Sequence, residues 1–518
     1  AEAAAAAAAP KRYHYPDRNV SMKEVGMGLG VLRLRAALLA FIVVPLVAAL
    51  AARYALSSAE LQALVASFRA MSPPPSSGAV LPLAMLVSGV VLVVLAVTVY
   101  WVRQPYPVYL IDFDVHQPPD RQKISRRAFI EKSRAVGCFT DEALAFQEKL
   151  LYRTGVGDES YFPAPLFETP PDQSMQGARD EAMAVMSDVF EGVMAKTGVT
   201  PLDIDILIVN CSLFNPTPSH CSMLINKYKM RSDIKSYNLA GMGCSAGVIA
   251  VDLARDLLQA HRSKTCLIIS YENITRNWYT GSRKSMLLQN TLFRLGGAGI
   301  LLSNRNRDYW FGRAKYELLA TVRVHKGQSD DAYRAVYETE DDTGRRGVDL
   351  SRKLLNAVGD ALKSNMTLLG PLVLPYSEQA WFLVVLAARK VLGKHAVKPY
   401  IPNFKRAFDH YCIHAGGRAV IDGLQENLGL SDYDVQPSRA TLYRYGNTSS
   451  SSVWYELMFT ERAGRMHRGD VVWQIAIGSG IKCNSAVWRS LKRLESSGAD
   501  DIAAAASRQQ QQQQQQQP

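Results

Sequence analysis

A cysteine near the middle of the chain stands in a sequence that suits a nucleophile. In SYNLAGMGCSAGVIAVDLARDLL (236–258), small residues lead into Cys244, and an apolar run with helical periodicity follows it. The pattern predicts a strand, a tight turn and a helix that starts at the thiol. Unpaired N–H groups at a helix start favour a thiolate, which could attack a thioester carbonyl. Free cysteines are more often simply buried, but the glycine-rich turn favours a reactive thiol here.

A thiol nucleophile needs a partner that takes and returns a proton, and a histidine can supply it. The segment HYCIHAGG places His410, Cys412 and His414 on one side of an extended strand, and small residues follow His414. His414 is therefore the first candidate. His410 and His325, which ends an apolar strand in VRVHKG, are further candidates. A zinc site built on H-x-C-x-H would lack a second pair of ligands, so no metal is expected.

An asparagine in a third segment could complete the site. RYGNTSSSSVWYEL (444–457) contains a Gly-Asn turn and a serine run that leads into a helix. The Asn447 amide could form a simple cap or turn, or it could donate a hydrogen bond to a developing enolate oxygen. Spacing alone does not decide between these roles. A glycine turn within IGSG (477–480) is expected to line the same cavity.

The elements that must position these segments alternate between strands and helices. Apolar runs rich in β-branched residues predict strands at 205–210, 265–270, 298–303, 318–325 and 470–479. Helical stretches lie at 244–261 and 377–393. This alternation predicts an α/β domain over 103–492, with sheets covered by helices. Residues 493–518, rich in Ala and Gln, are expected to form a disordered tail.

Composition narrows the class of partner. The chain carries a net charge of +12, with lysines and arginines spread along its length, which suits an anionic ligand such as coenzyme A. No zinc-finger spacing and no interleaving of basic and aromatic residues supports a nucleic-acid partner. The seven cysteines include no C-x-x-C pair and are expected to be reduced thiols.

Two uncharged runs near the N-terminus predict a transmembrane hairpin. A basic tail (1–35) precedes the first run (36–52), which is at the short end of what spans a bilayer, and the second run covers 79–102. Lysines and arginines are frequent before the first run and after the second, and few lie between them. The positive-inside rule then places both ends in the cytosol. We therefore expect two membrane helices within 36–102 and a working domain on the cytosolic face.

Six motifs between Tyr106 and Trp488 carry a resemblance to a known family. They are NCSLFNPTPS (210–219), NLAGMGCSAGVIA (238–250), ENITRNWYTG (272–281), LFRLGGAGILLSN (292–304), HYCIHAGGRAVID (410–422) and GNTSSSSVWYEL (446–457). In this order they resemble the plant-type 3-ketoacyl-CoA synthases of fatty acid elongation, within the thiolase superfamily. The paired N-terminal runs also fit that family.

The resemblance implies a thiolase-like, five-layered αβαβα fold of two similar halves, usually dimeric and here preceded by the transmembrane hairpin. It assigns a catalytic triad to Cys244, His414 and Asn447. It also matches His325 and His410 with further histidines of the family pattern.

One position departs from the family pattern. Tyr443 stands where many members have a histidine. Because a tyrosine cannot act as a base near neutral pH, any role of that extra histidine does not carry over.

The resemblance also implies a reaction. Cys244 takes the acyl group from a long-chain or very-long-chain acyl-CoA. Malonyl-CoA then loses carbon dioxide, while His414 and Asn447 donate hydrogen bonds to the enolate oxygen. The product is a 3-ketoacyl-CoA, so the chain would be a very-long-chain 3-oxoacyl-CoA synthase, an acyltransferase of the first elongation step. Malonyl-CoA and acyl-CoA are the substrates, and no added cofactor is expected.

The implied setting is the endoplasmic reticulum membrane, with the catalytic domain facing the cytosol. The implied partners are a second copy of the chain and the other elongase subunits, namely the ketoacyl reductase, the dehydratase and the enoyl reductase. Two alternatives remain at this stage. The chain could be an enzyme like the type III polyketide synthases, or a non-catalytic scaffold of the elongase.

Overall fold

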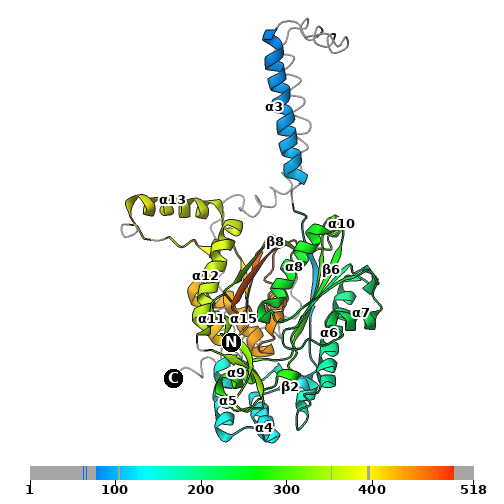
Figure 1. Ribbon diagram of the computed structural model, residues 1–518, viewed down its shortest axis with the longest axis vertical. Helices are drawn as coiled ribbons and strands as arrows, with labels where there is room; N and C mark the ends of the chain where they lie inside the picture. Colours follow the sequence, from blue (N-terminus) through cyan, green and yellow to red (C-terminus); the bar gives the residue numbers. More distant parts are fainter. Residues whose placement is uncertain are drawn as a thin grey trace, which may run out of the picture. The chain divides into compact units, whose positions relative to one another are not determined.

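The computed structural model describes residues 77–102, 105–351, 353–393, 397–398 and 400–494, together with Gln62 and Ala66. The chain divides into two compact units, Ala1–Tyr106 and Pro107–Pro518 (Figure 1).

In the first unit, the second predicted span forms a continuous helix, α3 (Ser77–Val102). Its side chains are described only from residue 88 to residue 100, where they are uncharged and mostly exposed. The predicted basic tail (1–35) and the first predicted span (36–52) lie outside the described residues, as does almost all of the predicted C-terminal tail. Among the described residues, no helix combines the length and the apolar character that crossing a bilayer requires.

A mixed sheet of nine strands forms the centre of the second unit, in the order β11-β12-β13-β8-β1-β7-β6-β4-β5 (Figure 1). The strands are β1 (Tyr109–Val115), β4 (Ile206–Asn210), β5 (Lys235–Leu239), β6 (Thr265–Tyr271), β7 (Gly297–Ser303), β8 (Tyr316–His325), β11 (His410–Ile413), β12 (Val471–Gly478) and β13 (Lys482–Ser490). β4 runs parallel to β5 and β6, and β11 runs parallel to β12. Two small sheets pair β2 (Lys123–Ile124) with β3 (Ser160–Tyr161), and β9 (Val336–Glu340) with β10 (Arg346–Leu350).

A short strand pairing joins the two halves of the large sheet. β1 pairs with β8 through Tyr109–Glu317 and Leu110–Tyr316. By contrast, β8 and β13 pair along nearly their whole length. The sheet therefore has one half from β1 to β5 in the strand order and another from β8 to β11.

Helices cover and separate these halves. Their bounds are α4 (Arg126–Val136), α5 (Asp141–Thr154), α6 (Met175–Thr197), α7 (His220–Tyr228), α8 (Ala246–Ala260), α9 (Lys284–Leu292), α10 (Asn306–Trp310), α11 (Asp330–Tyr333), α12 (Leu354–Val373), α13 (Tyr376–Leu392), α14 (Arg418–Leu428), α15 (Asp432–Tyr445) and α16 (Ser452–Arg462). α6 and α7 contact strands of the first half, and α12 contacts β8 and β13 of the second. α8 and α16 contact strands of both halves, so the sheet folds around these two helices.

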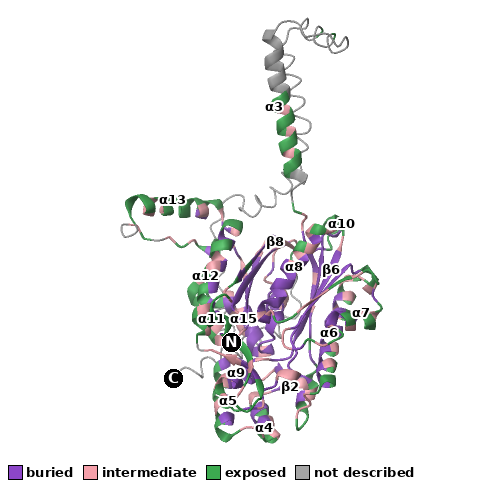
Figure 2. Ribbon diagram, in the orientation of Figure 1, coloured by how far each residue is buried: buried purple, intermediate pink, exposed green. Residues whose placement is uncertain are grey.

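The predicted α/β class and all five predicted strands are confirmed, as β4, β6, β7, β8 and β12. β4, β6 and β7 are buried at every position, which explains their continuous apolar sequences (Figure 2). Both predicted helices are also present, as α8 and α13. The expectation that these helices cover sheets is wrong for α13, because twelve of its 17 residues are exposed and only Glu378 is buried.

Candidate active site

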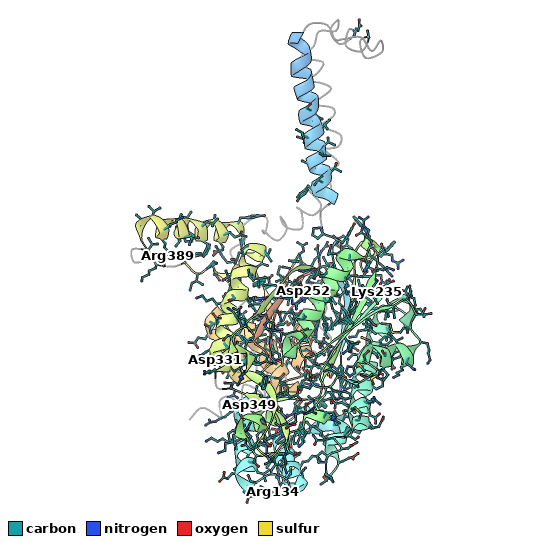
Figure 3. The ribbon with its side chains drawn as sticks, in the orientation of Figure 1. Arg134, Lys235, Asp252, Asp331, Asp349 and Arg389 are labelled. Atoms are coloured by element: carbon teal, nitrogen blue, oxygen red, sulfur yellow. The ribbon has the colours of Figure 1, made fainter. Side chains whose placement is uncertain are left out.

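The predicted nucleophile lies at the start of a central helix. β5 ends at Leu239, a turn with left-handed glycines follows, and the 3-10 turn Gly243–Ser245 leads directly into α8. Cys244 is thus where the predicted strand, turn and helix place it. Further along α8, Asp252 (Figure 3) accepts a hydrogen bond from Thr321 of β8, which ties this helix to the other half of the sheet.

His414 directly follows β11, on the opposite edge of the sheet. Its ring is buried, and its Nδ1 lies 2.8 Å from the Ser452 hydroxyl oxygen at the start of α16. Since Nδ1 is engaged, Nε2 is the nitrogen available to a substrate. His410, at the other end of β11, instead places Nε2 3.0 Å from a carboxylate oxygen of Asp470. Among the described residues, no group of three or more His, Cys, Asp and Glu side chains is placed to hold a metal ion.

Asn447 occupies the connection between α15 and α16 and is held from several sides. Its backbone N–H donates to the Leu292 carbonyl at 3.0 Å, and its own carbonyl accepts from the Arg294 N–H at 3.0 Å. The side-chain Oδ1 accepts from the Ser449 N–H at 2.8 Å, and Nδ2 donates to the Gly416 carbonyl at 3.3 Å. The amide therefore does shape a local turn, and its second N–H is still available for a ligand.

Cys244, His414 and Asn447 line one cavity of about 550 Å³. The predicted glycine turn lines it too, with Ile477, Gly478 and Ser479. Three strand ends and one helix connection, far apart in sequence, thus converge on the same space.

The other two candidate histidines do not line this cavity. His325, at the end of β8, is exposed, and its Nδ1 accepts a hydrogen bond from the Gly327 N–H at 2.9 Å. His410 is engaged with Asp470. In this structure both therefore stand apart from the space where the thiol, imidazole and amide meet.

Most other walls of the cavity are apolar and come from α5, α9, α12 and the small sheet of β9 and β10. The apolar side chains are Leu150, Leu288, Leu292, Phe293, Val336, Val348, Leu350, Leu354, Leu355, Val358 and Val420. A cavity of this size and lining is typical of sites for small apolar ligands. It suits a flexible hydrocarbon chain whose reactive end reaches the polar side chains.

Burial sets the protonation states of the thiol and the imidazole. Burial lowers the pKa of His414 to about 4, so its ring is neutral near pH 7. Burial raises the pKa of Cys244 to about 11, helped by the Glu272 carboxylate and opposed by a hydrogen bond with Ser449. In the resting site, burial therefore outweighs the expected stabilisation of a thiolate by the start of the helix. The site holds a neutral thiol and a neutral imidazole that can accept the thiol proton.

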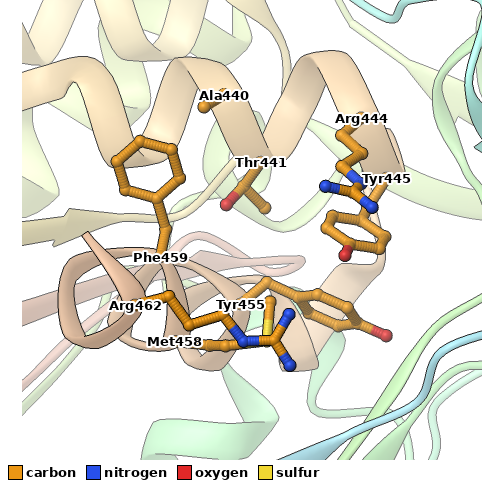
Figure 4. A pocket seen from close by; sticks show the side chains of 8 residues that line it. All are labelled: Ala440, Thr441, Arg444, Tyr445, Tyr455, Met458, Phe459 and Arg462. Atoms are coloured by element: carbon orange, nitrogen blue, oxygen red, sulfur yellow. The ribbon is translucent and has the colours of Figure 1, made fainter. Parts of the chain in front are cut away.

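A second hollow, between α15 and α16, is too small to hold a substrate (Figure 4). Its volume of about 20 Å³ leaves room for roughly one water molecule. Aromatic and basic side chains line it, among them Arg444, Tyr445, Tyr455 and Arg462.

Comparisons with known proteins agree with this geometry. Residues 100–391 match a family model described as FAE1/Type III polyketide synthase-like protein. Residues 405–490 match the model of the 3-oxoacyl-[acyl-carrier-protein (ACP)] synthase III C terminal region. Over 407 residues the chain is 55 % identical to 3-ketoacyl-CoA synthase 4 of Arabidopsis thaliana, and the match covers 78 % of each chain. The chain belongs to the plant 3-ketoacyl-CoA synthase family.

Other relatives from the 3-ketoacyl-CoA synthase family support the assignment. The chain is 53 % identical over 408 residues to 3-ketoacyl-CoA synthase 2 of Arabidopsis thaliana, which covers 78 % of this chain and 77 % of the relative. It is 51 % identical over 406 residues to the probable 3-ketoacyl-CoA synthase 20 of Oryza sativa subsp. japonica, with the same coverage.

Comparison with solved structures identifies the fold class of this 3-ketoacyl-CoA synthase. PKS-I from the brown algae Ectocarpus siliculosus matches with a TM-score of 0.58 and 18 % identity, over 75 % of this chain and 100 % of that one. The 1,3,6,8-tetrahydroxynaphthalene synthase of Streptomyces coelicolor A3(2) matches with a TM-score of 0.55 and 21 % identity, over 74 % and 99 %. At this identity the likeness shows the fold alone, which is the predicted thiolase-like α/β fold.

One cavity residue of this 3-ketoacyl-CoA synthase was missed from the sequence. Glu272 is buried and lines the cavity beside Cys244. Its Oε1 accepts from the N–H groups of Ser212 at 3.0 Å and Leu213 at 2.8 Å, and its Oε2 accepts from the Ser449 hydroxyl at 3.2 Å. Burial raises its pKa. The only sequence signal was its place at the start of the ENITRNWYTG motif.

The position that departs from the 3-ketoacyl-CoA synthase pattern lies outside the cavity. Tyr443, on α15, is buried and does not line the space around Cys244. Its ring packs so closely over Gly157 that a Cβ there would come within 2.6 Å of it. The Gly157 N–H also donates to the Tyr443 carbonyl at 2.8 Å, so this position holds two segments of the fold together.

Replacing Gly243 with alanine is expected to destabilise the protein and remove most of its activity. Gly243 has a φ of +71°, and an added Cβ would lie 2.4 Å from the Ser479 hydroxyl oxygen and 2.5 Å from its backbone nitrogen. Gly241→Ala is a matched control, because φ is +64° but no atom lies within 4 Å. In the control, the free energy of unfolding should fall only by the cost of a left-handed backbone at a residue with a side chain, about 1–2 kcal/mol. Thermal unfolding and turnover measure the difference; equal losses for the two variants would contradict the close packing.

Lowering the pH is expected to destabilise the folded protein through two buried histidines. Burial lowers the pKa values of His414 and His220 to about 4. An unfolded histidine titrates near pH ~6.5, so between about pH 6.5 and 4 the unfolded state binds protons that the folded state does not. The free energy of unfolding therefore falls over this range, and denaturant titrations at several pH values measure it.

Glutamine variants separate this stability effect from catalysis. His414→Gln and His220→Gln should each make the fall in stability shallower, because each removes one depressed group. Only His414→Gln should also stop turnover, since His220 does not line the cavity. If neither variant changes how the free energy of unfolding falls with decreasing pH, His414 and His220 are not the cause of that fall.

Proposed function

We propose that this chain catalyses the decarboxylative condensation of malonyl-CoA with a long-chain or very-long-chain acyl-CoA, the first step of fatty acid elongation. The observation that carries the proposal is the meeting of Cys244, His414 and Asn447 in one cavity whose other walls are mostly apolar. Relatives at 51–55 % identity are named 3-ketoacyl-CoA synthases. The apolar walls give an acyl chain a place beside the thiol.

The first stage transfers the acyl group to the enzyme. The Nε2 of neutral His414 accepts the Cys244 proton, and the sulfur attacks the carbonyl carbon of the acyl-CoA thioester. The carbon–sulfur bond to coenzyme A breaks, and the departing thiolate takes the proton back from the imidazolium. The acyl chain remains on Cys244 as a thioester, and the imidazole is neutral again.

The second stage forms the new carbon–carbon bond. Malonyl-CoA loses carbon dioxide, and the electron pair of the broken bond enters an enolate of the remaining thioester. Hydrogen bonds from His414 and Asn447 stabilise the enolate oxygen. The Ser452 hydroxyl can accept a hydrogen bond from a protonated Nδ1 of His414 or donate one to an unprotonated Nδ1. It therefore suits both neutral tautomers: the one whose Nε2 accepts a proton and the one whose Nε2 carries a proton. The enolate carbon attacks the acyl thioester, and the carbon–sulfur bond to Cys244 breaks to give the 3-ketoacyl-CoA. The Cys244 thiolate that leaves takes up a proton, ultimately from solvent, which restores the resting thiol.

We also propose the setting that the sequence predicts. An N-terminal hairpin would anchor the chain in the endoplasmic reticulum membrane, with the catalytic unit in the cytosol. The uncharged run within α3 and the excess of basic residues flanking the two runs support this. We propose a homodimer of the five-layered fold, acting with the ketoacyl reductase, dehydratase and enoyl reductase of an elongase. No metal, flavin or nicotinamide takes part in the proposed reaction.

A labelling experiment tests the function directly. Microsomes containing the protein are incubated with labelled malonyl-CoA and a panel of saturated acyl-CoAs, beside a Cys244→Ala control. Label in 3-ketoacyl products of the wild type alone supports the condensing enzyme and identifies its preferred primer. Pyrones or aromatic products would point to a polyketide synthase. Absence of label with every primer, in the presence of the other elongase subunits, would refute the proposed catalysis.

A further inference from the structure

The helix α13 is more exposed to solvent than its many apolar residues would predict. It has 17 residues, and Glu378 is its one buried residue. Figure 2 draws α13 mostly as exposed, with several half-buried positions along it. Its exposed side chains nevertheless include Trp381, Phe382, Leu383, Val384 and Leu386. Apolar patches of this kind on soluble proteins mark contact sites.

The exposed apolar side chains cover most, but not all, of the circumference of the helix. Residues 381–384 are consecutive, and successive side chains of an α-helix point about 100° apart. All four are exposed, with Leu383 at 61 % and Val384 at 55 %. A helix that is apolar all round is normally buried on all sides. A second protein chain packed against one face would leave the rest in water, whereas a bilayer interface can cover most of the helix.

The charges near α13 suit an anionic surface. Its one acidic residue, Glu378, is buried and binds Arg406 at 2.6 Å and Tyr400 at 2.5 Å. The last turn of the helix carries Lys390, which is exposed, and Arg389 (Figure 3), which is half-buried and donates to the Val397 carbonyl at 2.5 Å. Basic side chains beside an apolar helix are typical of proteins that rest on membranes with anionic head groups.

The preceding helix connects this surface to the active site. At its start, α12 contributes Leu354, Leu355 and Val358 to the lining of the cavity that holds Cys244. Near its end, Leu368 and Leu372 are exposed. Gln379 of α13 donates to the Pro371 carbonyl in the last turn of α12, so α12 runs from the cavity wall to the start of α13.

We propose that α13 and the exposed end of α12 (Leu368 and Leu372) lie in the interfacial region of a phospholipid bilayer with anionic head groups. Through α12, this contact would connect the wall of the cavity with the medium that holds long acyl chains. The consequence for acyl chains rests on the proposed function, whereas the bilayer contact does not.

The contact is tested with the full-length protein in phosphatidylcholine–phosphatidylserine vesicles that contain a lipid with a photoactivatable acyl chain. After illumination, mass spectrometry should find lipid cross-links within 376–392, and α4, a partly exposed helix of the same unit, should carry none. Absence of lipid cross-links on α13, or equal cross-linking of α4, would overturn the proposal.

A paired variant tests what the contact does for the reaction. Leu383→Glu with Leu386→Glu should abolish lipid cross-linking on α13 and lower turnover of a long-chain acyl-CoA presented in vesicles. Turnover of the same substrate in detergent micelles should stay at the wild-type level. Leu202→Glu is the matched control, because Leu202 is 58 % exposed, like Leu383, but lies elsewhere on the surface.

The outcomes separate this inference from the proposed function. If the double variant turns over long-chain acyl-CoA in vesicles as fast as the wild type, the contact has no role in supplying the substrate. If lipid cross-links persist on α13 of the double variant, Leu383 and Leu386 do not hold the helix in the bilayer interface. Wild-type protein that condenses acyl-CoA but shows no lipid contact at α13 would refute the inference alone. Wild-type protein that binds lipid at α13 but never condenses would refute the proposed function alone.

Discussion

Cys244→Ala is expected to lower the condensation rate on the order of 10⁴-fold or more, because the variant has no atom to carry the acyl group. Intact-protein mass spectrometry after incubation with acyl-CoA should show an acyl adduct on the wild type and none on the variant. The fold should be retained, since alanine is smaller and needs no hydrogen bond. Release of carbon dioxide from malonyl-CoA should persist at a low rate, because His414 and Asn447 remain in place.

Cys138→Ala provides the control for this prediction. Cys138 is a free, partly exposed thiol that does not line the cavity. This variant should keep both the acyl adduct and full turnover. An acyl adduct on the Cys244→Ala protein would show that another side chain is the nucleophile.

Asn447→Asp is expected to lower the rate of malonyl-CoA decarboxylation by about 10²–10³-fold, as for the loss of one oxyanion donor. Aspartate keeps an oxygen that can accept from the Ser449 N–H, so the local turn should persist. It loses the N–H groups of the amide and adds a negative charge where the enolate charge develops. Acyl loading on Cys244 should be affected far less, because that step does not require the amide donor.

Separate assays of the two stages measure this difference. Radiolabelled carbon dioxide release reports on decarboxylation, and the mass of the acyl-enzyme reports on loading. Asn427→Asp, an exposed position on α14, is the matched control and should change neither. Equal losses in both stages would argue that Asn447 has only a structural role.

The sequence predicted β4, β6 and β7 because their buried residues form mostly continuous apolar runs. β13 was missed because its buried residues include Asn484 and Ser485, which interrupt the apolar pattern. Ser485 is paired inside the protein, where its hydroxyl accepts from the Trp473 indole N–H at 2.9 Å. A sequence does not show which polar side chains find a partner in the core.

Only part of the candidate site was predicted from the sequence, for similar reasons. Cys244, His414 and Asn447 each stood beside glycines or small residues, and the structure places all three on one cavity. His325 and His410 carried the same kind of local signal but face other partners. Glu272 was missed because a carboxylate is usually solvated. Its burial depends on N–H groups from a distant loop.

The short joint between the sheet halves has a consequence for how the active site is aligned. β5, which leads to Cys244, and β11, which leads to His414, are the two outermost strands of the nine-stranded sheet. The thiol and the imidazole therefore come from opposite edges of the sheet, and α8 and α16, which contact strands of both halves, bridge the short β1–β8 pairing between them. The distance between the thiol and the imidazole thus depends on how these two helices pack between the halves, so side chains remote from the substrate help to align the reacting groups.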